Sequence, residues 1–140
     1  RDIIVCGHSD CGAMKALVNP ELLEGMPNVA AWLRHSQAAK SVLDASYPNL
    51  ENGAAVRAAS LENVVVQIAH LRTHPSVAAG IARGEIALHG WFVDIHAGQM
   101  LALDGETGRF LPVRENEPLP VAVRAAQRLA ADFVQAEAAE

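Results

Sequence analysis

The sequence of 140 residues has few aromatic side chains, only two cysteines and no long apolar run. Aromatic residues make up 4% of a chain that is 51% hydrophobic, so the core must consist mainly of alanine, valine, leucine and isoleucine. Cys6 and Cys11 lie too close together to suggest the disulfide framework of a secreted domain, which favours a reducing cytoplasm. No apolar stretch approaches the roughly 20 residues needed to span a bilayer, so we expect no membrane partner.

Clusters of basic residues are absent as well. The formal net charge is -5, and no group of Lys and Arg residues is interleaved with aromatic side chains. We therefore expect no nucleic-acid partner. The sequence begins at Arg1, without a methionine, and runs directly into an apolar strand, so we expect the natural amino terminus to lie further upstream.

Hydrophobic patterning predicts one α/β domain over residues 1–140, incomplete at its amino terminus. Its expected core is a mainly parallel β-sheet flanked by helices, followed by carboxyl-terminal hairpin strands and a helix. The apolar, β-branched run at residues 3–7 is typical of a strand buried on both faces of a parallel sheet. Later strand-like runs, separated by glycine-containing turns at 97–98 and 105–108, cover residues 86–95, 100–103 and 109–113. Helical spacing predicts helices over residues 13–18, 27 to about 43, 54–71, 76–82 and 121–138.

The segment Gly-His-Ser-Asp-Cys-Gly at residues 7–12 carries the main chemical signal. It follows the first strand, and open α/β sheets place their sites at the carboxyl ends of such strands. Gly7 and Gly12 have the spacing of a phosphate-binding loop, but that loop continues with Lys and Ser or Thr. Ala13 and Met14 stand there instead, which excludes a phosphate-binding loop of this type.

A serine nucleophile is the second possibility at this turn. Gly7, His8, Ser9 and Asp10 match four places of the Gly-x-Ser-x-Gly elbow, but Cys11 occupies the fifth place, where the tight turn needs glycine. A hydrolase of this kind also needs further parallel strands to supply its Asp and His, whereas the segment that follows reads as helices. A serine hydrolase that uses Ser9 is therefore the weaker alternative.

A metal site is the third possibility. His8 and Cys11 are three residues apart across the turn, so both side chains can converge on one point, and imidazole and thiolate are the preferred zinc ligands. Ser9 and Asp10 are candidate N-caps of the following helix, which would put Cys11 in its first turn, where the helix dipole favours a thiolate. A His-x-x-Cys pair alone is weak evidence, since a buried thiol beside a hydrogen-bonded histidine has the same spacing.

The surrounding sequence resembles a known family. Residues 3–17 are similar to the second zinc motif of bacterial β-class carbonic anhydrases. The similarity continues in residues 27–33, 63–64, 71–75 and 88–95, and weakens after about Val113.

The resemblance implies a zinc enzyme. In that family Zn²⁺ is held by Cys, His and Cys, so His8 and Cys11 would be the second and third ligands. The first Cys, with the Asp and Arg of a Cys-x-Asp-x-Arg block, is expected upstream, and no catalytic residue is assigned within this chain. Cys6 lies further back on the strand and is interpreted as a packing residue. The implied activity is reversible hydration of carbon dioxide to bicarbonate and a proton by zinc-bound hydroxide, in a homodimer or a multiple of dimers.

Two other functions stay open beside this one. A carbonic-anhydrase-like structural or regulatory module without activity would share the motif but lack one of the three zinc ligands. Relatives of the family also hydrolyse carbon disulfide or carbonyl sulfide.

The other polar and aromatic candidates receive structural interpretations. Asp10 is expected to cap a helix rather than to contact zinc-bound water, and His96, at a turn, is a candidate proton shuttle without specific support. We expect surface or capping roles for His70 and His74, a solvated His35, a hydrogen-bonded His89, and core or subunit contacts for Trp32, Trp91 and Phe92.

Overall fold

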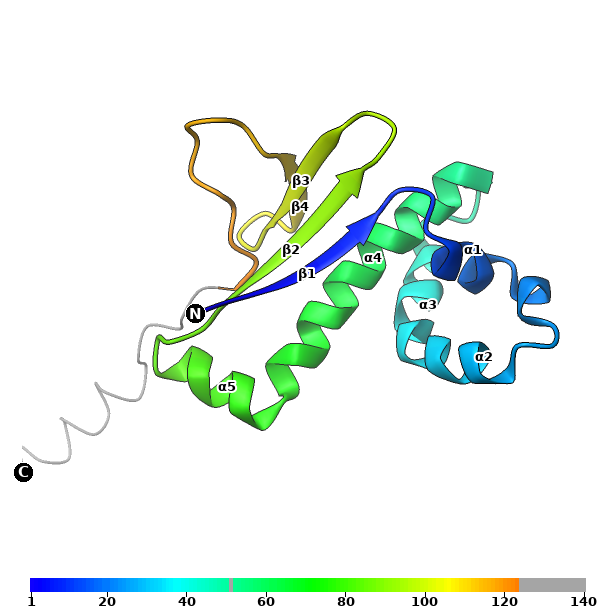
Figure 1. Cartoon of the computed structure of the whole chain (residues 1–140), viewed down its shortest axis with the longest axis horizontal. Helices are drawn as coiled ribbons and strands as arrows, with labels where there is room; N and C mark the ends of the chain where they lie inside the picture. The colour runs from blue at the N-terminus through cyan, green and yellow to red at the C-terminus, as the bar shows by residue number, and fades with distance from the viewer. Residues whose placement is uncertain (51, 124–140) are drawn as a thin grey trace, which may run out of the picture.

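The computed structural model describes residues 1–50 and 52–123 (Figure 1). The predicted helix over residues 121–138 lies outside the described residues from 124 onward. In chain order the elements are β1 (Asp2–His8), α1 (Gly12–Val18), η1 (Pro20–Leu23), α2 (Pro27–Leu33), η2 (Arg34–Ser36), α3 (Gln37–Ser46), α4 (Asn52–Thr73), α5 (Pro75–Ala82), β2 (Ala87–Asp94), β3 (Gln99–Asp104) and β4 (Arg109–Pro112).

One four-stranded sheet, in the order β1-β2-β3-β4, organises the described chain. β1 and β2 are parallel and are connected through the helices of the described residues, as expected of a βαβ unit. β3 and β4 add to β2 as the predicted antiparallel hairpins, with left-handed glycines at Gly98 and Gly108 in the turns. The α/β class is confirmed, and the sheet is mixed, with its parallel pairing at β1 and β2.

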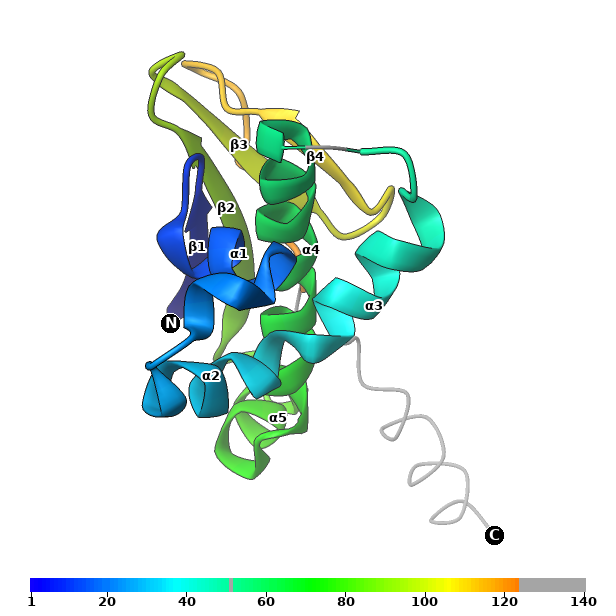
Figure 2. The same ribbon diagram turned by 90° about the vertical axis from the view of Figure 1, so that its right-hand side faces the viewer.

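The helices gather on one face of this sheet (Figures 1 and 2). The residues of β1 therefore alternate: Ile3, Val5 and Gly7 are half-buried toward α4, whereas Ile4 is 46% exposed and Cys6 is exposed. The prediction that this strand is buried on both faces is wrong for the described chain, and so is the assignment of Cys6 to the core. An apolar strand at a sheet edge with one helix layer has the same sequence pattern.

Two glycines bring α4 close to the sheet. A Cβ atom at Gly7 would lie 2.9 Å from Cγ2 of Val64, and one at Gly90 would lie 3.0 Å from Cγ1 of the same side chain. Val64 is 1% exposed, at the centre of this contact. Gly7 is thus needed for helix packing, and the close contact fixes the end of β1 relative to α4.

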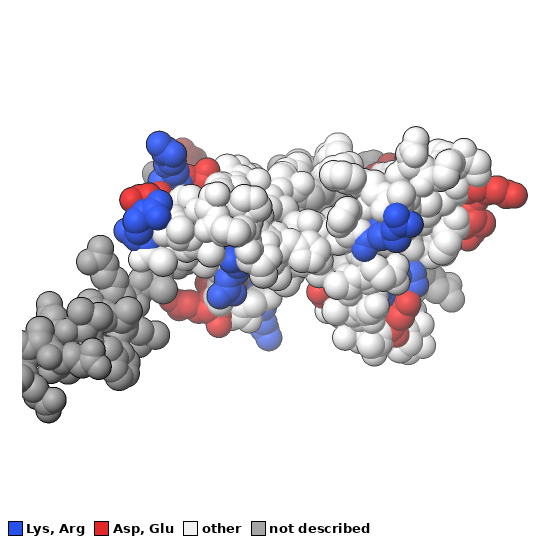
Figure 3. Space-filling view, turned by 90° about the horizontal axis from the view of Figure 1, so that it is seen from below, with Lys and Arg blue, Asp and Glu red and all other residues white. Residues whose placement is uncertain are grey.

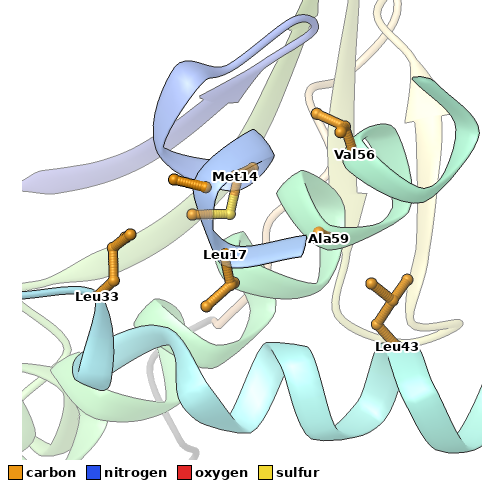
Figure 4. Close-up of a cluster of buried hydrophobic side chains, with 7 residues drawn as sticks. Met14, Leu17, Leu33, Leu43, Val56 and Ala59 are labelled. Atoms are coloured by element: carbon orange, nitrogen blue, oxygen red, sulfur yellow. The ribbon is translucent and has the colours of Figure 1, made fainter. Parts of the chain in front are cut away.

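A hydrophobic cluster joins α1 to the helices around it (Figure 4). Its labelled members are Met14, Leu17, Leu33, Leu43, Val56 and Ala59.

The predicted helix from residue 27 is interrupted by η2. Leu33 and Leu43 are ten residues apart, which in a continuous α-helix would place them about 80° apart around the axis. Three residues of 3₁₀ geometry add about 60° of rotation and bring both side chains to nearly the same face. Both leucines are buried in the cluster, which gives the interruption a packing role.

Candidate metal centre

The turn between β1 and α1 is built on one left-handed residue. Asp10 has φ 60°, a conformation that Asp adopts more readily than most residues, and the chain reverses direction there. Cys11 follows with extended backbone angles, φ -64° and ψ 119°, and is the N-cap of α1. The prediction that Ser9 or Asp10 caps the helix is wrong, because the left-handed residue delays the helix until Gly12. Cys11 accordingly lies at the cap and not in the first turn.

His8 presents its ring on the exposed face of β1. Its Nδ1 atom lies 2.8 Å from the carbonyl oxygen of Ser9. A carbonyl can only accept, so Nδ1 is the donor, which makes Nε2 the nitrogen that would coordinate a metal. Metal-binding histidines commonly have one ring nitrogen oriented by such a hydrogen bond.

Cys11 supplies the second donor. Its thiol is free and half-buried. An imidazole with a free Nε2 and a thiol on neighbouring elements fit the donor chemistry of zinc. Within residues 1–50 and 52–123, no group of three or more His, Cys, Asp or Glu side chains is placed to hold a metal. The described chain therefore carries two candidate donors, His8 and Cys11, on the two sides of one turn.

Asp10 is paired with Lys15 of α1. The hydrogen bond from the Lys15 ammonium, together with its charge, lowers the pKa of the Asp10 carboxyl below the usual value. This ion pair occupies the carboxylate, so Asp10 has a structural role different from the predicted cap.

Ser9 is buried and acts as a hydrogen-bond acceptor. Its Oγ accepts the N–H of Ile95 at 2.9 Å, and its own N–H donates to the carbonyl of Val93 at 2.9 Å. Only 8% of the residue is exposed. A serine nucleophile needs an accessible oxygen beside a general base, so this geometry argues against the hydrolase alternative.

A cavity of about 580 Å³ lies beside the turn, on the side of α1 and α4. Its charged lining includes the Asp10–Lys15 pair and a second pair, in which Nη1 of Arg57 lies 2.5 Å from Oδ2 of Asp94. The Arg57 guanidinium also lies 4.7 Å from the centre of the Phe92 ring. The pKa of the Asp94 carboxyl lies below its usual value. The main cause is the hydrogen bond from the backbone N–H of Ala97, and the hydrogen bond and charge of Arg57 act in the same direction.

Sequence reasoning missed Arg57 and Asp94. They are 37 residues apart, on a helix and at the end of a strand, and no local pattern pairs them. Only the position of Asp94 at the carboxyl end of a strand could have drawn attention to it.

The remaining histidines take surface or structural positions. His35, His70 and His74 are exposed, as predicted, and His74 is the N-cap of α5. His89 is 9% exposed, and its Nε2 lies 2.8 Å from Oδ1 of Asp2, as expected of a hydrogen-bonded structural residue. His96 is exposed and lines the cavity.

The three aromatic candidates differ in burial. Phe92 is fully buried, which confirms its core assignment, and Trp91 is half-buried. Trp32 is 73% exposed, so a core role is wrong for it within the described chain, and a subunit contact stays a prediction. On the face shown in Figure 3 the charged side chains of the described residues are scattered among wide uncharged areas. No described helix is long and apolar enough to cross a membrane.

Comparison with known proteins gives one consistent family. A family model described as carbonic anhydrase matches residues 1–100. The chain is similar to the carbonic anhydrase of Pseudomonas aeruginosa, with 44% identity over 115 residues that cover 82% of this chain and 52% of that protein. It is also similar to the carbonic anhydrase of Synechocystis, with 41% identity over 106 residues, 75% of this chain and 39% of that protein. The chain thus spans about half the length, or less, of these curated relatives.

Solved structures agree in fold. The β-carbonic anhydrase CcaA matches with a TM-score of 0.80 and 36% identity, covering 87% of this chain and 54% of that one. One of the tetrameric β-carbonic anhydrases of the filamentous ascomycete Sordaria macrospora matches with a TM-score of 0.61 and 26% identity, over 73% of this chain and 51% of that one.

Proposed function

The chain belongs to the β-carbonic anhydrase family, and from this membership we propose that it takes part in reversible hydration of carbon dioxide at a zinc ion held in part by His8 and Cys11. The observation that carries the proposal is the position of the two side chains at the end of β1 and the start of α1, with Nε2 of His8 left free by the bond from Nδ1 to Ser9. Zinc held there would supply the nucleophile for carbon dioxide at neutral pH.

The residues of the turn orient the two donors. The Ser9 carbonyl fixes the His8 ring through Nδ1. Cys11 is the N-cap of α1, and the backbone N–H groups at the amino-terminal end of a helix lack helical partners and favour a negative charge nearby. Gly12 leaves open space beside Cys11, because a Cβ atom there would meet nothing within 4 Å.

A module without activity is the second candidate. A structural zinc site is closed by four protein ligands and a catalytic site uses three, whereas no group of three or more candidate ligands is found among the described residues. A chain that binds no zinc and still folds would have the role of a structural or regulatory module.

Hydration kinetics test the proposed activity. Stopped-flow measurement of carbon dioxide hydration should show zinc-dependent acceleration by the chain, with a loss of at least about 100-fold in Cys11→Ser because a ligand is removed. Cys6→Ser is the matched control, since Cys6 is the only other cysteine and lies on the exposed face of β1. Equal rates for Cys11→Ser and Cys6→Ser would contradict the proposed role of Cys11, and no acceleration by a zinc-loaded chain would favour the inactive module.

A further inference from the structure

Ser9 connects the turn that carries His8 and Cys11 to strand β2 by hydrogen bonds. The parallel ladder of β1 and β2 ends at the pair of His8 and Val93. Ser9 extends it by one residue with two bonds, its N–H to the Val93 carbonyl and the Ile95 N–H to its Oγ, both at 2.9 Å. The bond from the Ile95 N–H is accepted by the Ser9 side chain, so it requires a side-chain oxygen at residue 9.

The end of β2 is also hydrogen-bonded to helix α4. The Asp94 carboxylate accepts a bond from Arg57 at 2.5 Å and from the backbone N–H of Ala97 at 3.1 Å. Arg57 belongs to α4, the helix that packs against both β1 and β2. Ser9 therefore connects the turn to a part of the sheet that is already fixed to the helix layer.

We propose that Ser9 is a positioning residue for the metal ligands His8 and Cys11, an inference that rests on the function proposed above. Its carbonyl orients the His8 ring through Nδ1, and its hydroxyl fixes the peptide to which that carbonyl belongs. Removal of Oγ leaves the Ile95 N–H without its acceptor and frees the turn to move relative to β2. Partners of this kind behind metal ligands typically change metal affinity by about 10- to 100-fold.

Ser60 provides a control for the loss of a buried serine. It is 2% exposed, and its Oγ donates to the Val56 carbonyl at 2.8 Å within α4. Ser60→Ala removes a buried hydroxyl and one hydrogen bond, as Ser9→Ala does, but leaves the metal-ligand turn untouched. Ser9→Thr keeps an oxygen at the position and is the conservative variant.

The experiment has two readouts on the full chain. The first is the dissociation constant for Zn²⁺, measured by competition with a chromophoric chelator. The second is amide hydrogen exchange of residues 8–12 and of Ile95 in the metal-free protein. Ser9→Ala should bind Zn²⁺ about 10- to 100-fold more weakly than the wild type and exchange faster at these amides. Ser9→Thr and Ser60→Ala should stay close to the wild type in both.

The outcomes separate this inference from the proposed function. Equal Zn²⁺ affinity in the wild type and in Ser9→Ala overturns the positioning role and leaves the function intact. A wild type without Zn²⁺ affinity overturns the proposed function, and unchanged exchange at residues 8–12 in Ser9→Ala then overturns the positioning role as well. If Ser9→Ala does not fold, Ile95→Pro removes the same hydrogen bond from the side of β2, because proline has no N–H. An unchanged Zn²⁺ affinity in that variant overturns the inference.

Discussion

At the scale of single residues, the site depends on which polar groups are already engaged. The Asp10 carboxylate is paired with Lys15, and Ser9 Oγ is occupied by Ile95. His8 Nε2 and the Cys11 thiol are the donors at this turn that these bonds leave available. The same six-residue segment thus contains both the proposed ligands and the groups that hold them in place.

Asp94 should make stability depend on pH. Its folded-state pKa is lowered by the Ala97 N–H and by Arg57, so the ionised form is the one that stabilises the fold. That contribution is present above the unfolded-state pKa of about 3.9 and is lost as the pH falls through the folded-state value. Asp94→Asn should lower the melting temperature at pH 7, and the difference from the wild type should shrink as the pH falls below 4.

The matched control for this prediction is Asp44→Asn, which breaks the exposed Lys40–Asp44 pair within α3. It should change the melting temperature less than Asp94→Asn at pH 7, because exposed pairs of this spacing contribute little. A difference between Asp94→Asn and the wild type that is the same at pH 7 and pH 3 would contradict the account of Asp94.

At the scale of secondary-structure elements, the contact between α4 and the sheet sets the geometry of the turn. Gly7 and Gly90 allow the helix to approach both parallel strands, and Val64 fills the space between them. Because Gly7 directly precedes His8, the position of His8 depends on the contact of β1 with α4, which lies beside the sheet in Figure 2.

Gly7→Ala should destabilise the fold. Its added Cβ would lie 2.9 Å from Val64 Cγ2 and 3.3 Å from the Ser60 carbonyl oxygen, and overpacking of this kind costs about 1–3 kcal/mol. Urea unfolding measures the loss, and Val64→Ala in the same chain should cost less in the Gly7→Ala background than in the wild type. Gly53→Ala is the control, since nothing lies within 4 Å of its Cβ position. An equal effect of Gly7→Ala and Gly53→Ala would contradict the close packing.

The sequence predicted the elements better than their contacts. Periodic apolar residues predicted α4, and the glycines at 98 and 108 predicted the hairpin turns. Both glycines take positive φ in the structure, a conformation that favours glycine. The close packing at Gly7 could not be predicted, because it depends on a helix residue more than 50 positions away. The Arg57–Asp94 pair is likewise a long-range contact without a local signal.

The site was predictable to the extent that it is local. His8 and Cys11 are three residues apart, so their placement at one turn follows from the strand and the helix on either side. The role of Ser9 was misjudged because its partner, Ile95, is 86 residues away. The positive φ of Asp10, which moves the N-cap to Cys11, depends on backbone geometry that residue preferences alone do not specify.

At the scale of the whole molecule, the face of the sheet opposite α4 carries exposed apolar side chains beside buried residues such as Ala102. Ile4 is 46% exposed on this face, and Leu111 of β4 is 39% exposed. Apolar side chains on an open sheet face are typical of an interaction surface. This supports the proposal that the working unit is a homodimer or a multiple of dimers.

Ile4→Lys should weaken that assembly. A charge in the middle of an apolar interface has to be desolvated on association, while the exposed position tolerates lysine in the monomer. Sedimentation velocity should show a shift toward the monomer at concentrations where the wild type is associated. Leu22→Lys, at an exposed position on η1, is the control and should leave the distribution unchanged. An Ile4→Lys variant that associates like the wild type would place the interface elsewhere.

The most direct test of the central claim is native mass spectrometry of the wild type, Cys11→Ser and Cys6→Ser, each purified with zinc present. The proposed site predicts bound zinc on the wild type and on Cys6→Ser, and its loss from Cys11→Ser. The same zinc content in all three proteins, or no zinc on any of them, would contradict a metal centre built on His8 and Cys11.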